Sequence, residues 1–201
     1  MNIDPLDIKK ISASLNLNEE YINYIIDDFN NILQPFITKN YLSHLVSAIE
    51  DVINDKVKKE LKHRIDTEKD DVKRQELFTL MEAKHYRLFP ILIEPFSIYN
   101  KRKAQIITFA KRNIGAGAII YYDDRLEDKQ KRLLIAHELG HLYMKYVSTK
   151  KTEKELEKVV TAFSILAILD KDDFYRNRSR ALISKSTDEI LSNVEQLFKF
   201  K

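Results

Sequence analysis

The five residues from His137 to His141 read His-Glu-Leu-Gly-His, and they constrain the fold of this chain more than any other feature of the sequence. They lie inside the run LLIAHELGHLYMKY, whose apolar positions predict a helix. Residues four positions apart share one face of a helix, so His137 and His141 can direct two imidazole nitrogens at one point. Gly140 costs such a helix about 1 kcal/mol relative to alanine, and the chain contains only 3 glycines. We therefore expect another element to approach this turn closely.

The same residues form the pattern HExxH, in which two histidines can bind one zinc ion at about 2.0–2.1 Å from each ring nitrogen. Glu138 lies about 100° round the helix from His137, where its carboxylate can reach a water on the metal without binding the metal. Zinc lowers the pKa of such a water towards about 7, and Glu138 could then accept its proton as general base for attack on a carbonyl group. The alternative is a pair of helical histidines whose nitrogens are satisfied by neighbouring side chains.

A catalytic zinc site needs a third protein ligand, and the expected source is a carboxylate downstream of His141 because the chain contains 0 cysteines. Glu157 follows His141 by 16 residues, which leaves room for a loop and an antiparallel return helix. It also borders the apolar stripe of that helix and can face the gap between the two helices. The other candidates are Glu153, Glu155, Asp170, Asp172 and Asp173. In the alternative interpretation, the acids of the first helical turn are solvated and favoured by the helix dipole.

The rest of the chain predicts a mostly helical α+β protein with a helical region at 1–88 and a second domain at 89–201. Apolar spacing and capping residues predict helices in the first region at about 5–15, 19–33, 38–63 and 67–87. In the second region Gln105–Ala110 and Ala118–Tyr122 predict an antiparallel pair of strands. Helices are then expected at about 130–147, beginning at Asp124 or Asp128, at about 152–169, and after a capping box at Ser186.

Composition and charge exclude several classes of protein. With 0 cysteines there is no disulfide framework or thiolate metal site, and no stretch approaches the roughly 20 apolar residues of a membrane span. The first residues, MNIDPLDIKK, do not form a secretory signal, so we expect a cytoplasmic protein.

The net charge of +3 is small, and the segment EEYINYIIDD, where a helix-turn-helix would have its recognition helix, is acidic. We therefore expect no nucleic-acid partner. A basic patch at Lys171, Arg176, Arg178 and Arg180 is expected to face solvent, and the alternative for this patch is an acidic partner or nucleic acid.

Two stretches of the sequence together resemble a known family. The stretch AIIYYDDRLEDKQKRLLIAHELGHLY, followed by Glu157 with Ala162, Ile165 and Leu166 at set distances after it, resembles the ImmA/IrrE family of zinc metallopeptidase domains. Lys158, Thr161 and Asp170 differ from the residues usual at those family positions. The resemblance covers about residues 100–170.

This resemblance implies a small gluzincin-like domain that binds Zn²⁺ and cleaves a specific intracellular protein, such as a repressor or regulator. It implies His137, His141 and Glu157 as metal ligands and Glu138 as the catalytic base. If the strand Ala118–Tyr122 lies at the sheet edge, an extended peptide substrate could pair with it. The candidates for stabilising the oxyanion are Tyr121, Tyr122, Tyr143, Tyr146 and His85. The alternative function is a non-catalytic regulatory or partner-binding protein that retains the zincin fold.

Overall fold

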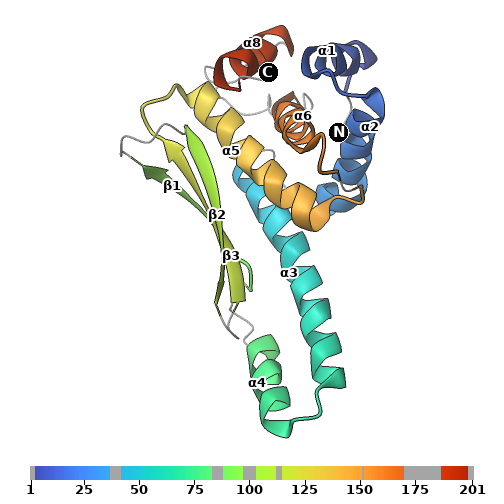
Figure 1. Cartoon of the computed structure of the whole chain (residues 1–201), viewed down its shortest axis with the longest axis vertical. Helices are drawn as coiled ribbons and strands as arrows, with labels where there is room; N and C mark the ends of the chain where they lie inside the picture. Colours follow the sequence, from blue (N-terminus) through green and yellow to red (C-terminus); the bar gives the residue numbers. More distant parts are fainter. Residues whose placement is uncertain are drawn as a thin grey trace.

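A computed structural model describes residues 3–36, 42–82, 88–96, 103–111, 115–150, 152–169 and 187–198. These residues form helices and one three-stranded sheet, which confirms the predicted mostly helical α+β class (Figure 1). Asp170, Asp172, Asp173, His85, the basic patch at 171–180 and the capping box at Ser186 lie outside the described residues.

The first two helices begin at the capping residues that the sequence indicates. The side chain of Asp4 accepts a hydrogen bond from the amide of Leu6 at the start of α1 (Pro5–Leu15). Asn18 accepts one from the amide of Glu20 at the start of α2 (Glu19–Asp28). The chain continues from α2 into the π-helical turn η1 (Phe29–Leu33) and the 3₁₀ turn η2 (Gln34–Phe36). The single predicted helix at 19–33 is therefore helical throughout, but its last turn is wider.

The boundary between the third and fourth helices differs from the prediction. The third helix, α3 (Leu42–Thr67), extends to the residue at which the fourth was expected to begin. The fourth, α4 (Asp71–Glu82), begins where the carboxylate of Asp70 accepts hydrogen bonds from the amides of Val72 and Lys73. Asp70 rather than Thr67 thus caps the helix, since the hydroxyl of Thr67 donates back to the carbonyl of His63.

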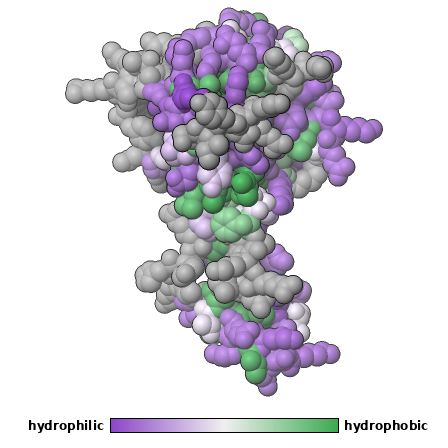
Figure 2. Space-filling view, turned by 60° about the vertical axis from the view of Figure 1, so that its left-hand side comes forward, coloured by the Kyte–Doolittle hydropathy of each residue, from purple (hydrophilic) through white to green (hydrophobic). Residues whose placement is uncertain are grey.

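The C-terminal end of α3 and the whole of α4 project from the rest of the molecule as an arm (Figure 1). No residue of α4 is buried. Figure 2 shows the arm as a narrow extension whose far end is mainly hydrophilic on the visible face. The core and the candidate site therefore lie in the remainder of the chain.

The sheet contains the predicted antiparallel pair and one further strand. β2 (Ala104–Lys111) pairs antiparallel with β3 (Gly115–Asp123), and β1 (Ile91–Phe96) pairs parallel with the other side of β3. The predicted antiparallel pair is confirmed, but the sheet as a whole is mixed, because β1, which was not predicted, pairs parallel with β3. Pro95 within β1 hid this strand in the sequence, although proline is tolerated on an edge strand. The strand order β1-β3-β2 also places Ala118–Tyr122 in the middle of the sheet, so this strand offers no free edge.

The helix α5 (Asp128–Leu142) contains the His-Glu-Leu-Gly-His motif and continues as the π-helical turn η3 (Tyr143–Val147). Of the two predicted starts, Asp128 is its first residue, because the carboxylate of Asp124 accepts a hydrogen bond from Lys131 instead of capping the helix. Every residue from Leu133 to Gly140 is buried. The helix lies between the sheet and the other helices, which explains its burial on all sides (Figure 1).

Two further helices pack around α5. These are α6 (Leu156–Leu169), which packs directly against α5, and α8 (Thr187–Leu197), which contacts α1, α5 and α6. One hydrophobic core includes side chains from both sides of residue 88, among them Ile22, Ile49, Ile120, Leu139 and Phe163. The division into domains at 1–88 and 89–201 stays a prediction. Among the described helices, none combines the length and apolar character that crossing a membrane requires.

The helices α5 and α6 are in close contact at Gly140. A β-carbon at this position would lie 2.9 Å from the Cγ1 atom of Val160, 3.1 Å from its carbonyl oxygen and 3.2 Å from the ring of Phe163. The χ1 angle of valine is stiff in a helix, so Val160 cannot easily move its methyl group away. The expectation that another element closely approaches this turn is confirmed.

A buried carboxylate holds the far end of α5 against α2. Asp28 accepts hydrogen bonds from the hydroxyl of Tyr143 at 2.7 Å, and from the hydroxyl and amide of Thr149 at 2.9 and 3.2 Å. Burial raises the pKa of Tyr143, so its hydroxyl remains protonated and can donate. The N-terminal helices are thereby tied to the turn that leads from α5 towards α6.

We expect Gly140→Ala to lower the free energy of unfolding by up to about 2 kcal/mol, measured by urea denaturation with chelator present. Overpacking costs about 1–3 kcal/mol, and the higher helix propensity of alanine returns about 1 kcal/mol. Adding Val160→Ala removes the nearest clash, so the double variant should lose at least about 0.5 kcal/mol less than the sum of the single variants. Strict additivity would show that the two residues do not compete for space.

We expect Asp28→Ala to lower the free energy of unfolding by about 1–3 kcal/mol, because it leaves the buried hydroxyl of Tyr143 without its acceptor. Asp27 is its exposed neighbour and provides the control. Asp27→Ala should change stability by less than about 0.5 kcal/mol. Equal losses in the two variants, measured by chemical denaturation, would contradict a special role for the buried carboxylate.

Candidate metal centre

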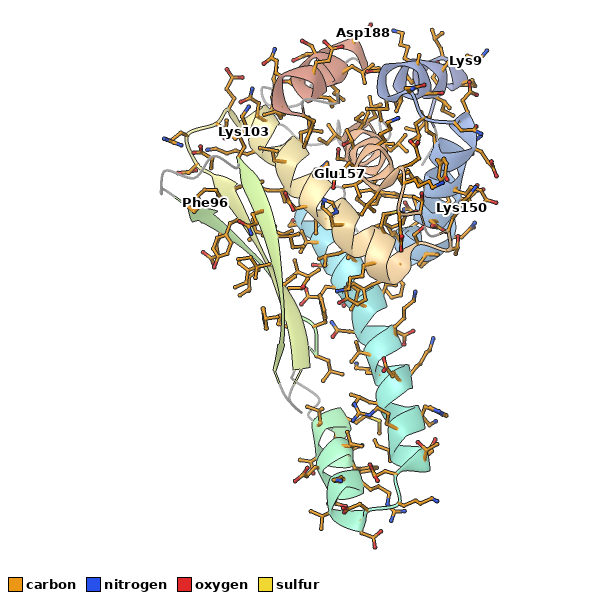
Figure 3. The ribbon with its side chains drawn as sticks, viewed as in Figure 1. Lys9, Phe96, Lys103, Lys150, Glu157 and Asp188 are labelled. Carbon is orange, nitrogen blue, oxygen red and sulfur yellow. The ribbon has the colours of Figure 1, made fainter. Side chains whose placement is uncertain are left out.

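Three side chains from two helices converge where α5 faces α6. Nitrogen atoms of His137 and His141 and a carboxylate oxygen of Glu157 all lie within 4.8 Å of one another. The Nε2 atom of His137 is 3.4 Å from one carboxylate oxygen of Glu157, and the Nε2 atom of His141 is 3.8 Å from the other. Figure 3 shows Glu157 in the space between α5 and α6. The structure therefore brings together the three residues predicted as ligands.

The distances and donor types fit a zinc ion. Four ligands arranged tetrahedrally at about 2.0–2.1 Å from zinc lie about 3.3–3.4 Å from one another. The measured separation of 3.4 Å between His137 and Glu157 matches this spacing, and the 3.8 Å between His141 and Glu157 needs only a small adjustment. Two imidazole nitrogens and one carboxylate also form a donor set that zinc accepts in catalytic sites, with the fourth position left for water or substrate.

The surroundings favour the protonation states that metal binding requires. Burial, and then the neighbouring imidazole of His137, lower the pKa of His141, which favours the neutral ring. The imidazole of His137 lowers the pKa of Glu157, which favours the ionised carboxylate. Neutral imidazole and ionised carboxylate are the forms that bind a cation.

The ring of His137 is held on two sides. Its Nδ1 atom lies 3.2 Å from the hydroxyl oxygen of Thr161, one turn after Glu157 on α6. The ring of Phe198, just after α8, stacks on it with centroids 4.3 Å apart and planes inclined by 26°. His137 is only 5% exposed, whereas the side chain of Glu157 is 64% exposed. His137 is thus fixed in the core, and Glu157 lies at the surface.

Glu138 is buried in α5 and lies in the wall of an open groove that also borders His141. The groove has a volume of about 750 Å³ and runs between α5, the edge strand β2 and the start of α6. Its lining consists of Ala104, Gln105, Ile106, Thr108, Glu138, His141, Leu142, Met144, Lys145, Thr152, Glu153 and Leu156. A carboxylate beside a candidate metal site, facing an accessible groove, can exchange a proton with a molecule bound there.

The alternative third ligands lie elsewhere. Glu153 is exposed and lines the groove, and Glu155 forms an ion pair with Lys158 at 3.3 Å. Neither belongs to the group formed with the two histidines. Glu155 precedes α6, whereas Glu157 lies in its first turn and reaches the two histidines of α5. The feature of the sequence that indicated Glu157 was its position at the border of the apolar stripe.

The tyrosines considered for oxyanion stabilisation have other positions. Tyr143 is buried and donates to Asp28, Tyr146 packs edge-on against Phe89, and Tyr121 packs edge-on against Phe96. Tyr122 is partly buried against the hydrophobic core. None of these four lines the groove.

Two residues near the site, Thr161 and Phe198, were not identified as part of it from the sequence. Thr161 is a polar residue in the apolar helix α6, one turn after Glu157, and this pattern could have indicated it. No local pattern indicates Phe198, because its contact with His137 joins two distant parts of the chain.

Comparison with known proteins identifies the family to which the chain belongs. A peptidase family model described as the IrrE N-terminal-like domain matches residues 90–197, which is more than half of the chain. The comparisons with curated proteins and with solved structures gave no match. The family match confirms the resemblance seen in the sequence and extends beyond the residues that carried it. The chain therefore belongs to the IrrE N-terminal-like, or ImmA/IrrE, family of peptidase domains.

Proposed function

We propose that the chain is a zinc-dependent endopeptidase with a gluzincin-like arrangement of sheet and metal-binding helix. Its substrate would be a specific intracellular protein, of the repressor or regulator kind that the family resemblance implies. The observation that carries the proposal is the group of His137, His141 and Glu157, with Glu138 beside it in the wall of an open groove. Membership of a peptidase family supports the same reaction class.

Each residue has a distinct role in this proposal. The Nε2 atoms of the two histidines and the carboxylate of Glu157 would hold the ion. Zinc, when bound there, would polarise the scissile carbonyl and activate a water molecule. Glu138 would accept a proton at its carboxylate and pass it to the leaving amide nitrogen, as a general base and then a general acid. Burial of His137 and Glu138 keeps bulk water away from one side of the site.

The free edge of β2 is the surface that suits an extended peptide. Within the described sheet, β2 pairs through one edge with β3. The residues of β2 that line the groove beside Glu138 are Ala104, Gln105, Ile106 and Thr108. A peptide that added a strand at this edge would form main-chain hydrogen bonds and lie along the groove. This role falls to β2 because β3 occupies the middle of the sheet.

The second candidate function is a non-catalytic regulatory or partner-binding protein with the same fold. The observation that favours it is that none of the four candidate tyrosines, Tyr121, Tyr122, Tyr143 and Tyr146, lines the groove in which an oxyanion would form. In that case the groove would still bind a protein segment, but Glu138 would not be required for its biological effect. Replacing Glu138 therefore separates the two candidates.

We expect the purified chain to bind about one zinc ion per molecule, measured by elemental analysis after dialysis. His137→Ala and Glu157→Ala should each weaken zinc binding at least about 100-fold in a chelator competition, because each removes one of three protein ligands. Glu153→Ala removes a nearby carboxylate outside the group and is the matched control. Wild-type zinc affinity in Glu157→Ala would contradict its assignment as the third ligand.

We expect Glu138→Gln to retain zinc and to lose at least about 100-fold in peptide cleavage, since the amide cannot accept the proton. Cleavage is measured on a mixture of synthetic peptides by mass spectrometry. Glu127→Gln makes the same chemical change at an exposed position before α5, outside the groove lining, and should cleave at the wild-type rate. If wild type and Glu138→Gln have the same biological effect and neither cleaves peptides, the non-catalytic candidate is correct.

A further inference from the structure

The hydroxyl of Thr161 contacts two of the three candidate ligands at once. Its oxygen lies 2.8 Å from the backbone carbonyl oxygen of Glu157 and 3.2 Å from the Nδ1 atom of His137. Thr161 is fully buried, and Ser164 is the other polar side chain among the buried residues of the helix that carries it. A buried hydroxyl in such a helix needs partners, and both of its partners here belong to the candidate metal centre.

The number of available protons determines the direction of each hydrogen bond. A carbonyl oxygen only accepts, so the single hydroxyl proton of Thr161 must be donated to Glu157. The hydroxyl oxygen then has only lone pairs left for His137. A hydrogen bond at 3.2 Å therefore requires the proton of the neutral imidazole to be on Nδ1. With the proton on Nδ1, the Nε2 atom carries a free lone pair, and this is the atom that faces Glu157.

We propose that Thr161 is a positioning residue of the metal centre, which fixes His137 in the Nδ1-protonated tautomer and so presents the Nε2 lone pair to the ion. The proposal rests on the proposed function in assuming that an ion binds between the histidines and Glu157. Residues that accept the second N–H of a metal-binding histidine orient the ring and raise its affinity for the metal. A threonine hydroxyl has this role here.

The rest of the environment restricts the ring further. Phe198 stacks on one face of His137 at a centroid distance of 4.3 Å, which limits rotation of the imidazole out of its plane. The bond from Thr161 to the carbonyl of Glu157 fixes the hydroxyl relative to the backbone of the third ligand. The hydroxyl of Thr161 thereby fixes the ring of His137 relative to the backbone of Glu157.

The test compares three variants of the full chain. Thr161→Val removes the hydroxyl with little change in volume, and Thr161→Ser keeps it. Ser164→Ala is the matched control, because Ser164 is a buried residue of the same helix whose hydroxyl donates to the carbonyl of Thr161 at 2.7 Å. Zinc dissociation constants are measured by chelator competition, and unfolding midpoints are measured in chelator.

We expect Thr161→Val to bind zinc about 10–100-fold more weakly than wild type, and Thr161→Ser and Ser164→Ala to stay within about threefold. A loss in Ser164→Ala equal to that in Thr161→Val would show a general effect of helix packing and would overturn the proposal. Wild-type affinity in Thr161→Val, or equal losses in the valine and serine variants, would also overturn it.

A second measurement does not depend on metal binding. Without an ion, the carboxylate of Glu157 competes for a proton on Nε2 of His137, 3.4 Å away, so the measurement uses Glu157→Ala as its background. Nitrogen-15 spectra of metal-free Glu157→Ala at about pH 8.5, where free imidazole is neutral, report which ring nitrogen of His137 carries the proton. We expect Nδ1–H in this variant and after adding Thr161→Ser, and a loss of this preference after adding Thr161→Val. A proton on Nε2 in Glu157→Ala would overturn the proposal. If Glu157→Ala shows Nδ1–H but the wild-type chain binds no zinc, the tautomer inference holds and the proposed function fails.

Discussion

The candidate site depends on the close approach of α5 and α6. His137 and His141 lie on one helix and Glu157 on the other, so the distances between their donor atoms are set by the separation of the two backbones. That separation is small because Gly140 has no side chain, and the methyl group and carbonyl of Val160 occupy the space that a β-carbon would need. A larger residue at 140 would move Glu157 away from both rings. One missing side chain thus permits the geometry of all three donors.

The N-terminal helices hold α6 and α8 in place through two hydrogen bonds. The ammonium group of Lys158, next to Glu157 in sequence, donates to the carbonyl of Asn16 at 3.1 Å, where α1 ends. The buried hydroxyl of Thr187, at the start of α8, donates to Asp7 on α1. Through α8 this contact also supports Phe198, which stacks on His137. The first helices therefore share in placing α6 and α8, and the site needs more of the chain than the segment that carries the motif.

The parts of the fold that depend on local sequence could be predicted, and those that depend on distant pairing could not. A spacing of four residues is enough to put His137 and His141 on one helical face, and Asp4 and Asn18 act on amides two residues away. Strand order involves segments far apart in the chain, so β1 was missed and β3 could not be placed in the middle of the sheet. Glu157 was predictable from its helix position, but Phe198 was not, because 61 residues separate it from His137.

Burial of polar groups in α5 gives the site its rigidity. A polar side chain in an apolar core is costly unless its hydrogen bonds are satisfied. For His137 this requirement is met by Thr161 on one side, which leaves the Nε2 atom facing Glu157 on the other. Glu157, whose side chain is 64% exposed, loses less hydration in this position and keeps more freedom. Preorganisation of the candidate site is therefore uneven: the histidine in the core is already fixed by its neighbours, and the carboxylate at the surface is the group with more freedom to adjust.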